Sequence, residues 1–255
     1  MPSANINGSE MYWEEAGSGD ALILIHGACS SSKRFSKVIP RLTDRFRVLA
    51  IDLRGMGQSA HVPSIAPSAW SDDVGALIKH LGLPAAHVYG VSLGARVALR
   101  TAIDNPSLVS TLCLDMPIIA NDEAGNSDLL KRFDANASAL SEERQSELRH
   151  LHGEDWENVF KNYSNIRSQA DVQGYLNLRE PSKSVTVPTF IMRGDEENEV
   201  HPLRHAVELH ENIAGSWLWI NPKSRGGMLE NATDASVPML ERFISNVAGR
   251  VPVSA

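Results

Sequence analysis

The residues best suited to chemistry lie in the stretch HVYGVSLGAR, residues 87–96, where an apolar run breaks at GVSLG and a helix-like run begins. A serine at the apex of a sharp strand-to-helix turn has a strained backbone and an exposed hydroxyl, and glycines two positions away on each side give that turn clearance. This spacing predicts a nucleophile elbow with Ser92 at its apex. The simpler alternative is a tight turn around a buried serine.

The segments that would hold this turn alternate between strand and helix. Short apolar runs predict strands at Ala21–His26, Phe46–Gly55, Val109–Met116, Val187–Asp195 and Ser216–Asn221, and a further strand that leads into the turn at Ser92. Helical spacing predicts helices at Ser30–Leu42, Trp70–Leu81, Pro202–Ile213 and Ala235–Val247. Since parallel strands need crossover connections, the alternation predicts an α/β fold, with a mostly parallel central sheet flanked by helices.

The N-terminal segment carries its own turn signal. Two β-type runs, Asn5–Glu15 and Ala21–His26, flank the sequence AGSGD at residues 16–20. We expect a hairpin there that leads into the first buried strand.

The strand and helix alternation lapses between Pro117 and Ser184. Two helix-like segments occur there, Ser127–Leu140 and Ser141–His152, together with scattered aromatic residues and no convincing strand. We expect residues 117–184 to form a helical cap over Ser92, inserted into a core of residues 1–116 and 185–255. Its aromatic content predicts a partly apolar pocket.

Composition narrows the classes of protein. The chain has 255 residues, 42% of them apolar, which is enough for one substantial hydrophobic core. Its formal net charge of −7 does not suit binding to nucleic acid or to an anionic membrane. The two cysteines, Cys29 and Cys113, have no metal-binding spacing. The first residues lack the pattern of a signal peptide, and no apolar run reaches transmembrane length. We therefore expect a cytoplasmic protein that binds a small molecule and needs no metal or cofactor, and its oligomeric state is left open.

Three motifs in order resemble the α/β-hydrolase fold family: His26-Gly27 at a strand end, the D-x-R-G-x-G-x-S segment Asp52–Ser59, and GVSLG. The resemblance covers nearly the whole chain and is to small lactonases, esterases and C–C bond hydrolases. It implies a serine hydrolase for an ester, lactone or similar small carbonyl substrate, with Ser92 as nucleophile. The oxyanion hole would be formed by the N–H groups of Ala28 and Leu93. We interpret Asp52–Ser59 as a structural loop, with Asp52 and Arg54 bracing neighbouring loops.

The acid that orients the catalytic base should follow the strand that ends near Gly194. The chain reads DEENEVHP at residues 195–202, against a family pattern like G-x-x-D-x-x-V-P. Spacing selects Glu197 and residue type selects Asp195. Asp115, which follows the preceding strand, is the third candidate because some family members place the acid there.

The expected histidine is missing from the last third of the chain. The family's G-H-x-x-x-x-E-x-P segment reads SRGGMLENA at residues 224–232, so the histidine position holds Arg225, or Gly227 if a short gap is allowed. An arginine stays protonated and has no acceptor lone pair, so it cannot take the serine proton. We therefore expect weak hydrolysis, which Arg225→His or Gly227→His would raise.

Alternatives to weak hydrolysis remain open. His201 could serve as the base, because it lies beside the acidic loop that would face the elbow. In a second alternative Arg225 anchors a substrate carboxylate or enolate and the oxyanion hole stabilises charge, as in a lyase, cyclase or isomerase. A third is a ligand-binding or interaction module, and a fourth is an altered chain whose natural histidine has been replaced.

Overall fold

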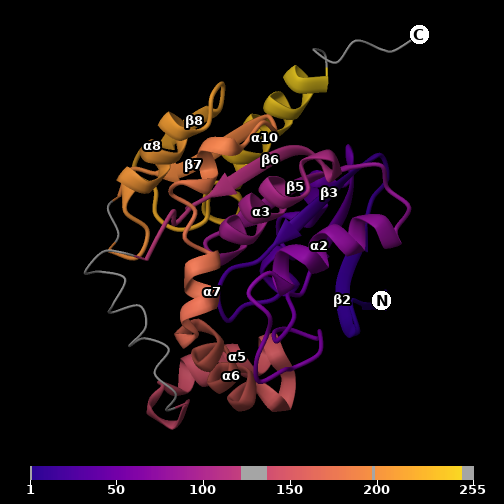
Figure 1. Ribbon diagram of the computed structural model, residues 1–255, viewed down its shortest axis with the longest axis vertical. Helices are drawn as coiled ribbons and strands as arrows, with labels where there is room; N and C mark the ends of the chain where they lie inside the picture. The colour runs from indigo at the N-terminus through magenta and orange to yellow at the C-terminus, as the bar shows by residue number, and fades with distance from the viewer. Residues whose placement is uncertain (1, 122–136, 197–198, 249–255) are drawn as a thin grey trace.

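An eight-stranded sheet lies at the centre of the computed structural model, which describes residues 2–121, 137–196 and 199–248 (Figure 1). Its strand order is β1-β2-β4-β3-β5-β6-β7-β8. The strands are β1 Ser3–Ile6, β2 Ser9–Ala16, β3 Asp20–Ile25, β4 Phe46–Ile51, β5 Ala86–Val91, β6 Val109–Asp115, β7 Thr189–Gly194 and β8 Trp217–Asn221. β1 and β2 pair antiparallel, and all pairings from β4 to β8 are parallel. The predicted fold class, a mostly parallel sheet with flanking helices, is confirmed.

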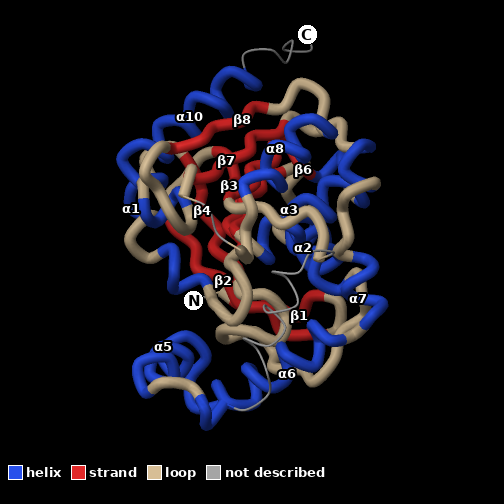
Figure 2. Tube along the Cα trace, turned by 90° about the vertical axis from the view of Figure 1, so that its left-hand side faces the viewer, coloured by secondary structure: helices blue, strands red, loops and turns tan. Residues whose placement is uncertain are grey.

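Helices cover both faces of the sheet, as Figure 2 shows. One face carries α2 Ala69–His80, α3 Leu93–Asp104 and α8 Leu203–Asn212, and the other carries α1 Ile39–Leu42, α9 Met228–Asn231 and α10 Thr233–Ala248. Alternate residues of β3 point to opposite layers: Ile23 and Ile25 pack with the first group, and Leu22 and Leu24 with the second. A strand buried on both faces needs a continuous apolar sequence, which explains the run LILI.

Two predictions near the N-terminus are corrected. The hairpin joins β1 to β2 at Asn7 and Gly8, whose positive φ angles of 50° and 76° suit a tight two-residue turn. β2 does not pair with β3, because β4 lies between them, antiparallel to β2 and parallel to β3. The helix expected at Ser30–Leu42 is split into the 3₁₀ turn η1, Ser32–Phe35, and α1, since Pro40 lacks the N–H needed to continue a helix.

The described part of the insertion, residues 137–184, is helical. It contains α5 Glu142–His152, α6 Trp156–Ser168 and α7 Ala170–Tyr175, and short 3₁₀ turns at Ala137–Ala139, Gly153–Asp155 and Pro181–Ser184. Another 3₁₀ turn, Pro106–Leu108, precedes β6. Most of the helix expected at Ser127–Leu140 lies outside the described residues. Helices α5 and α6 lie at the end of the molecule opposite α10 (Figure 1).

The insertion packs against loops that leave the carboxyl ends of strands. Lys33 Nζ, after β3, donates to the carbonyl of His150 at 2.6 Å, and the N–H of Gly57, after β4, donates to His152 Nδ1 at 2.9 Å. The aromatic residues Trp156, Phe160 and Tyr163 are at most 2% exposed and belong to the main hydrophobic core. They hold the insertion in place, so they give no support for an apolar pocket. The division into a core and a cap stays a prediction.

Candidate active site

Ser92 lies on the turn between β5 and α3 with φ 57° and ψ −114°, a conformation that non-glycine residues rarely adopt. The flanking glycines are required by close backbone approach. A Cβ on Gly90 would lie 2.1 Å from the carbonyl oxygen of Gly94, and one on Gly94 would lie 2.2 Å from that of Ile25. The strained turn is therefore confirmed, and it leaves the Ser92 side chain half-buried.

A histidine lies within hydrogen-bond distance of this serine. His201 Nε2 is 2.8 Å from Ser92 Oγ, and the imidazole comes from the loop between β7 and α8. This loop is fixed by Arg193 of β7, a side chain that is 1% exposed. The Arg193 guanidinium donates to the carbonyl of His201 at 2.5 Å and to that of Glu196 at 3.1 Å. Of the alternatives considered from the sequence, the structure brings His201 to the nucleophile.

The three candidate acids have different surroundings. Glu197 lies outside the described residues. Asp195 is exposed, and its Oδ1 accepts from the N–H of Ser224 at 3.3 Å. Asp115 is completely buried at the end of β6, and burial raises the pKa of its carboxyl to about 7.

Asp115 accepts hydrogen bonds from the loop that carries the family's histidine position. Its Oδ2 accepts from the Tyr89 hydroxyl at 2.6 Å and from the N–H groups of Met228 at 2.6 Å and Leu229 at 3.3 Å. These bonds attach the start of α9 to the end of β6. Asp115 is thus an anchor for the loop that precedes α9.

Of the two positions considered for the missing histidine, Gly227 borders the elbow. A Cβ on Gly227 would lie 3.3 Å from Val91 Cγ2, next to the serine. Arg225 is exposed, and the described residues show no interaction between it and Ser92. The role of Arg225 as an anion anchor in a lyase, cyclase, isomerase or binding module stays a prediction.

Arg34 is a residue near the elbow that the sequence did not single out. Its Nε and Nη2 donate to the two carboxylate oxygens of Glu230 at 2.6 and 2.7 Å. A Cβ on Gly27 would lie 3.1 Å from Arg34 Nη1 and 3.4 Å from Ser92 Cβ, so the guanidinium is close to the nucleophile. The sequence offered no signal for this, because a basic residue in a polar loop is usually solvated.

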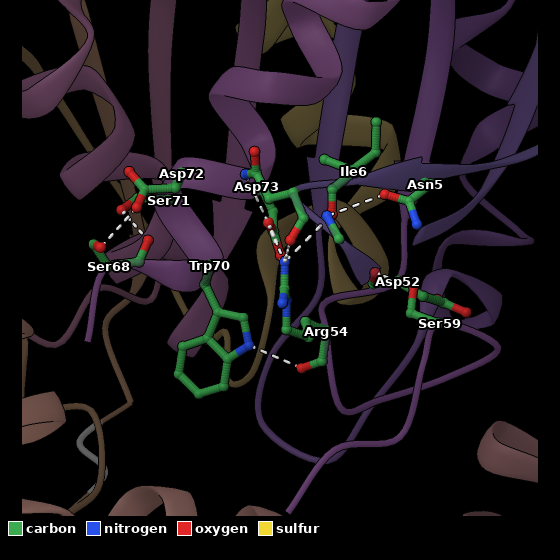
Figure 3. Close-up of polar contacts among 12 residues, drawn as sticks. Asn5, Ile6, Asp52, Arg54, Ser59, Ser68, Trp70, Ser71, Asp72 and Asp73 are labelled. Atoms are coloured by element: carbon green, nitrogen blue, oxygen red, sulfur yellow. Dashed lines mark hydrogen bonds and ion pairs between the residues drawn. The ribbon is translucent and has the colours of Figure 1, made fainter. Parts of the chain in front are cut away.

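The segment Asp52–Ser59 is a structural brace, as predicted. Asp52 accepts from the N–H groups of Ser32 at 2.5 Å and Gln58 at 2.7 Å, which ties the loop after β3 to the loop after β4. Figure 3 shows the Arg54 guanidinium facing the carboxylate of Asp73 and the Trp70 ring N–H directed at the Arg54 carbonyl. The distance from Arg54 Nη2 to Asp73 Oδ1 is 2.7 Å. These side chains fix loops around the site.

The strand-end histidine is also structural. His26 is fully buried, and its Nε2 accepts from the N–H of Leu53 at 3.1 Å. Burial lowers its pKa to about 3, so the ring is neutral. The adjacent Cys29 is buried, which raises the pKa of its thiol and makes it a poor nucleophile. Ala28 is half-buried, and the oxyanion hole assigned to Ala28 and Leu93 stays a prediction.

The parts of the chain that the structure describes show neither a cluster of metal-binding side chains nor a membrane-spanning helix. No group of three or more His, Cys, Asp or Glu side chains there could hold a metal ion. Among the same residues, no helix combines the length and apolar character needed to cross a bilayer.

Residues 20–215 match the family described as alpha/beta hydrolase fold, and this chain belongs to that family. A soluble epoxide hydrolase from a Corynebacterium species is 41% identical over 115 residues, which are 44% of this chain and 40% of that protein. A 2-(acetamidomethylene)succinate hydrolase from Mesorhizobium japonicum is 37% identical over 113 residues, 43% of this chain and 40% of that protein. The matched segment spans less than half the length of either relative.

Solved structures show the same architecture over nearly the whole chain. A meta-cleavage product hydrolase from Pseudomonas fluorescens superposes with a TM-score of 0.78 at 20% identity, over 96% of this chain and 98% of that one. An enol-lactonase from Burkholderia xenovorans superposes with a TM-score of 0.73 at 18% identity, over 96% of this chain and 100% of that one. At these identities the likeness establishes the fold.

Proposed function

We propose that the protein is a serine hydrolase for an ester, lactone or similar small carbonyl substrate, with Ser92 as nucleophile and His201 as general base. The observation that carries the proposal is the 2.8 Å distance between His201 Nε2 and Ser92 Oγ at a strained elbow. Family membership and the hydrolase names of the relatives support it. His201 takes the role that Arg225 and Gly227 cannot fill, so the weak activity expected from the sequence is not part of the proposal.

The reaction follows from the roles of these groups. His201 Nε2 accepts the hydroxyl proton while Ser92 Oγ attacks the carbonyl carbon of the substrate. The negative charge that forms on the carbonyl oxygen is stabilised by the N–H groups of Ala28 and Leu93. His201 then gives the proton to the leaving group, and water releases the acyl group by the same route.

We assign the acid that orients His201 to the loop that carries it, with Glu197 and Asp195 as candidates. Both precede His201 by only a few residues. Asp115 is less suited to orient His201, because its Oδ2 already accepts hydrogen bonds from the Tyr89 hydroxyl and from the backbone at the start of α9. Residues 117–184 are proposed as the cap, supported by their contacts with the loops after β3 and β4.

Mass spectrometry and ester hydrolysis test the nucleophile. We expect a fluorophosphonate to form an adduct on the peptide containing Ser92, and we expect Ser92→Ala to lower the hydrolysis of p-nitrophenyl butyrate by about 10⁴-fold or more. Ser64→Ala, at an exposed loop position, is the matched control. An adduct on another residue, or full activity of Ser92→Ala, would contradict the proposal.

A further inference from the structure

Arg34 lies between the elbow and a cavity at the junction of the core and the insertion. The cavity has a volume of about 320 Å³, and its polar lining includes Lys33, Arg34, Glu147 and Glu230. Arg34 therefore contacts both the cavity and the space beside Ser92.

The guanidinium has unused donors on the side of the nucleophile. Glu230 occupies Nε and Nη2, and Nη1 has no hydrogen-bond acceptor among the described residues. Because Gly27 has no side chain, Nη1 and the Ser92 side chain face the same small space. An arginine carries five N–H donors and no acceptor, so a group placed here must accept hydrogen bonds.

The charges around the cavity favour an anion. The Glu230 carboxylate is paired with Arg34 at 2.6 Å, and the Glu147 carboxylate with Arg144 at 2.5 Å. The ammonium of Lys33 donates to a backbone carbonyl and has no carboxylate partner among its described bonds. Lys33 and Arg34 balance Glu147 and Glu230 within the lining, and Arg144 beside it adds one positive charge, so the Lys33 ammonium is left without a carboxylate partner among the described residues.

We propose that Arg34 binds a carboxylate of the substrate, and that the protein selects esters or lactones bearing a free carboxylate near the reacting carbonyl. This inference rests on the proposed function. The substrate carboxylate accepts from Arg34 Nη1 while Ser92 attacks the carbonyl, and Glu230 holds the guanidinium plane in position. A charge-assisted hydrogen bond of this kind is strong enough to favour a substrate that carries a carboxylate over one that does not.

A pair of esters tests the selectivity. We compare kcat/KM for mono-p-nitrophenyl glutarate, which carries a carboxylate, with that for neutral p-nitrophenyl butyrate. We expect the wild-type ratio of glutarate to butyrate to exceed one and Arg34→Met to lower it by roughly 10- to 100-fold, mainly through KM. Arg34→Lys, which keeps the charge but loses the planar fork, should recover part of the ratio. Arg41→Met, which removes an exposed arginine paired with Asp234, should leave it unchanged.

Two further measurements keep the inference separate from the proposed function. Glu230→Gln removes a negative charge close to the proposed carboxylate site, while the glutamine oxygen can still accept from the Arg34 guanidinium, so this variant should raise the ratio even if Arg34→Met fails to fold. Calorimetric titration of Ser92→Ala with glutarate tests binding without catalysis, and Arg34→Met in that background should abolish it.

The possible results distinguish failure of the carboxylate site from failure of the proposed function. A ratio unchanged by Arg34→Met and Glu230→Gln, or glutarate binding that does not depend on Arg34, overturns the carboxylate site even when Ser92 is labelled and esters are cleaved. If Ser92 is not labelled and neither ester is cleaved, the proposed function fails, and Arg34-dependent binding of glutarate would still support the site.

Discussion

At the scale of single residues, the proposed chemistry joins two side chains that are 109 positions apart, Ser92 and His201. The serine could be found from sequence because its geometry is encoded locally, by two glycines that permit one sharp turn. The sequence offered His201 as one of several alternatives and could not select it, because its distance to Ser92 depends on the path of the loop after β7. Arg193 fixes that loop, yet a buried arginine in a strand gives no sequence signal.

Asp115 provides a residue-level prediction about pH. Its pKa is raised from 3.8 to about 7, so the fold favours the protonated carboxyl. The stabilising contribution of Asp115 is therefore fully present below pH 4 and is lost as the pH rises towards 7, by up to roughly 4 kcal/mol. In Asp115→Asn this change is absent.

The measurement is urea unfolding of both proteins at pH 4, 6 and 8. We expect the free energy of unfolding of Asp115→Asn to increase relative to that of the wild type as the pH rises from 4 to 8. Asp44→Asn, at an exposed position, is the control and should track the wild type. A constant difference between Asp115→Asn and the wild type would contradict the raised pKa.

At the scale of elements, the site depends on how closely α3 approaches the end of β3. The Cβ of Gly94→Ala would lie 2.2 Å from the backbone oxygen of Ile25, and neither backbone can move without disturbing the sheet. We expect this variant to lose about 3 kcal/mol or more of stability. Thermal unfolding measures the loss.

Gly174→Ala is the matched control for this prediction. Gly174 lies in α7 with no heavy atom within 4 Å of its Cβ position, so alanine should be neutral or stabilise the helix by about 0.5–1 kcal/mol. Equal effects of the two substitutions would show that the close approach is not what requires Gly94.

The parallel strands could be predicted because strands buried on both faces need continuous apolar runs. Most of the flanking helices could be predicted from the helical spacing of their apolar residues. The pairing of β2 could not, since β2 pairs with β4, which begins after 29 intervening residues, rather than with β3, the next strand in sequence. The Asn7-Gly8 turn was the available local signal, and it lay inside a run interpreted as one strand. Register between distant segments is set by tertiary packing, which periodicity does not describe.

At the scale of the whole molecule, the insertion and the sheet share one core. The buried Arg96 of α3 donates to the carbonyl of Leu176, and Trp156 packs into the same hydrophobic cluster as α2 and α3. Removal of the insertion would leave a buried guanidinium unpaired and apolar surface exposed, so we expect the sheet and its helices not to stay folded without it.

The assembled molecule brings Ser92, His201, Arg34 and Glu230 together from four separate segments. The central claim is that His201 replaces the histidine missing from the segment before α9. The most direct measurement is the rate of fluorophosphonate labelling of Ser92 in the wild type, His201→Ala and Arg225→His, with His80→Ala at an exposed position of α2 as control.

We predict fast labelling of the wild type, a loss on the order of 10⁴ to 10⁶ in His201→Ala, and no change in Arg225→His or His80→Ala. Wild-type labelling that is slow and is accelerated by Arg225→His or Gly227→His, or that survives in His201→Ala, would contradict the account.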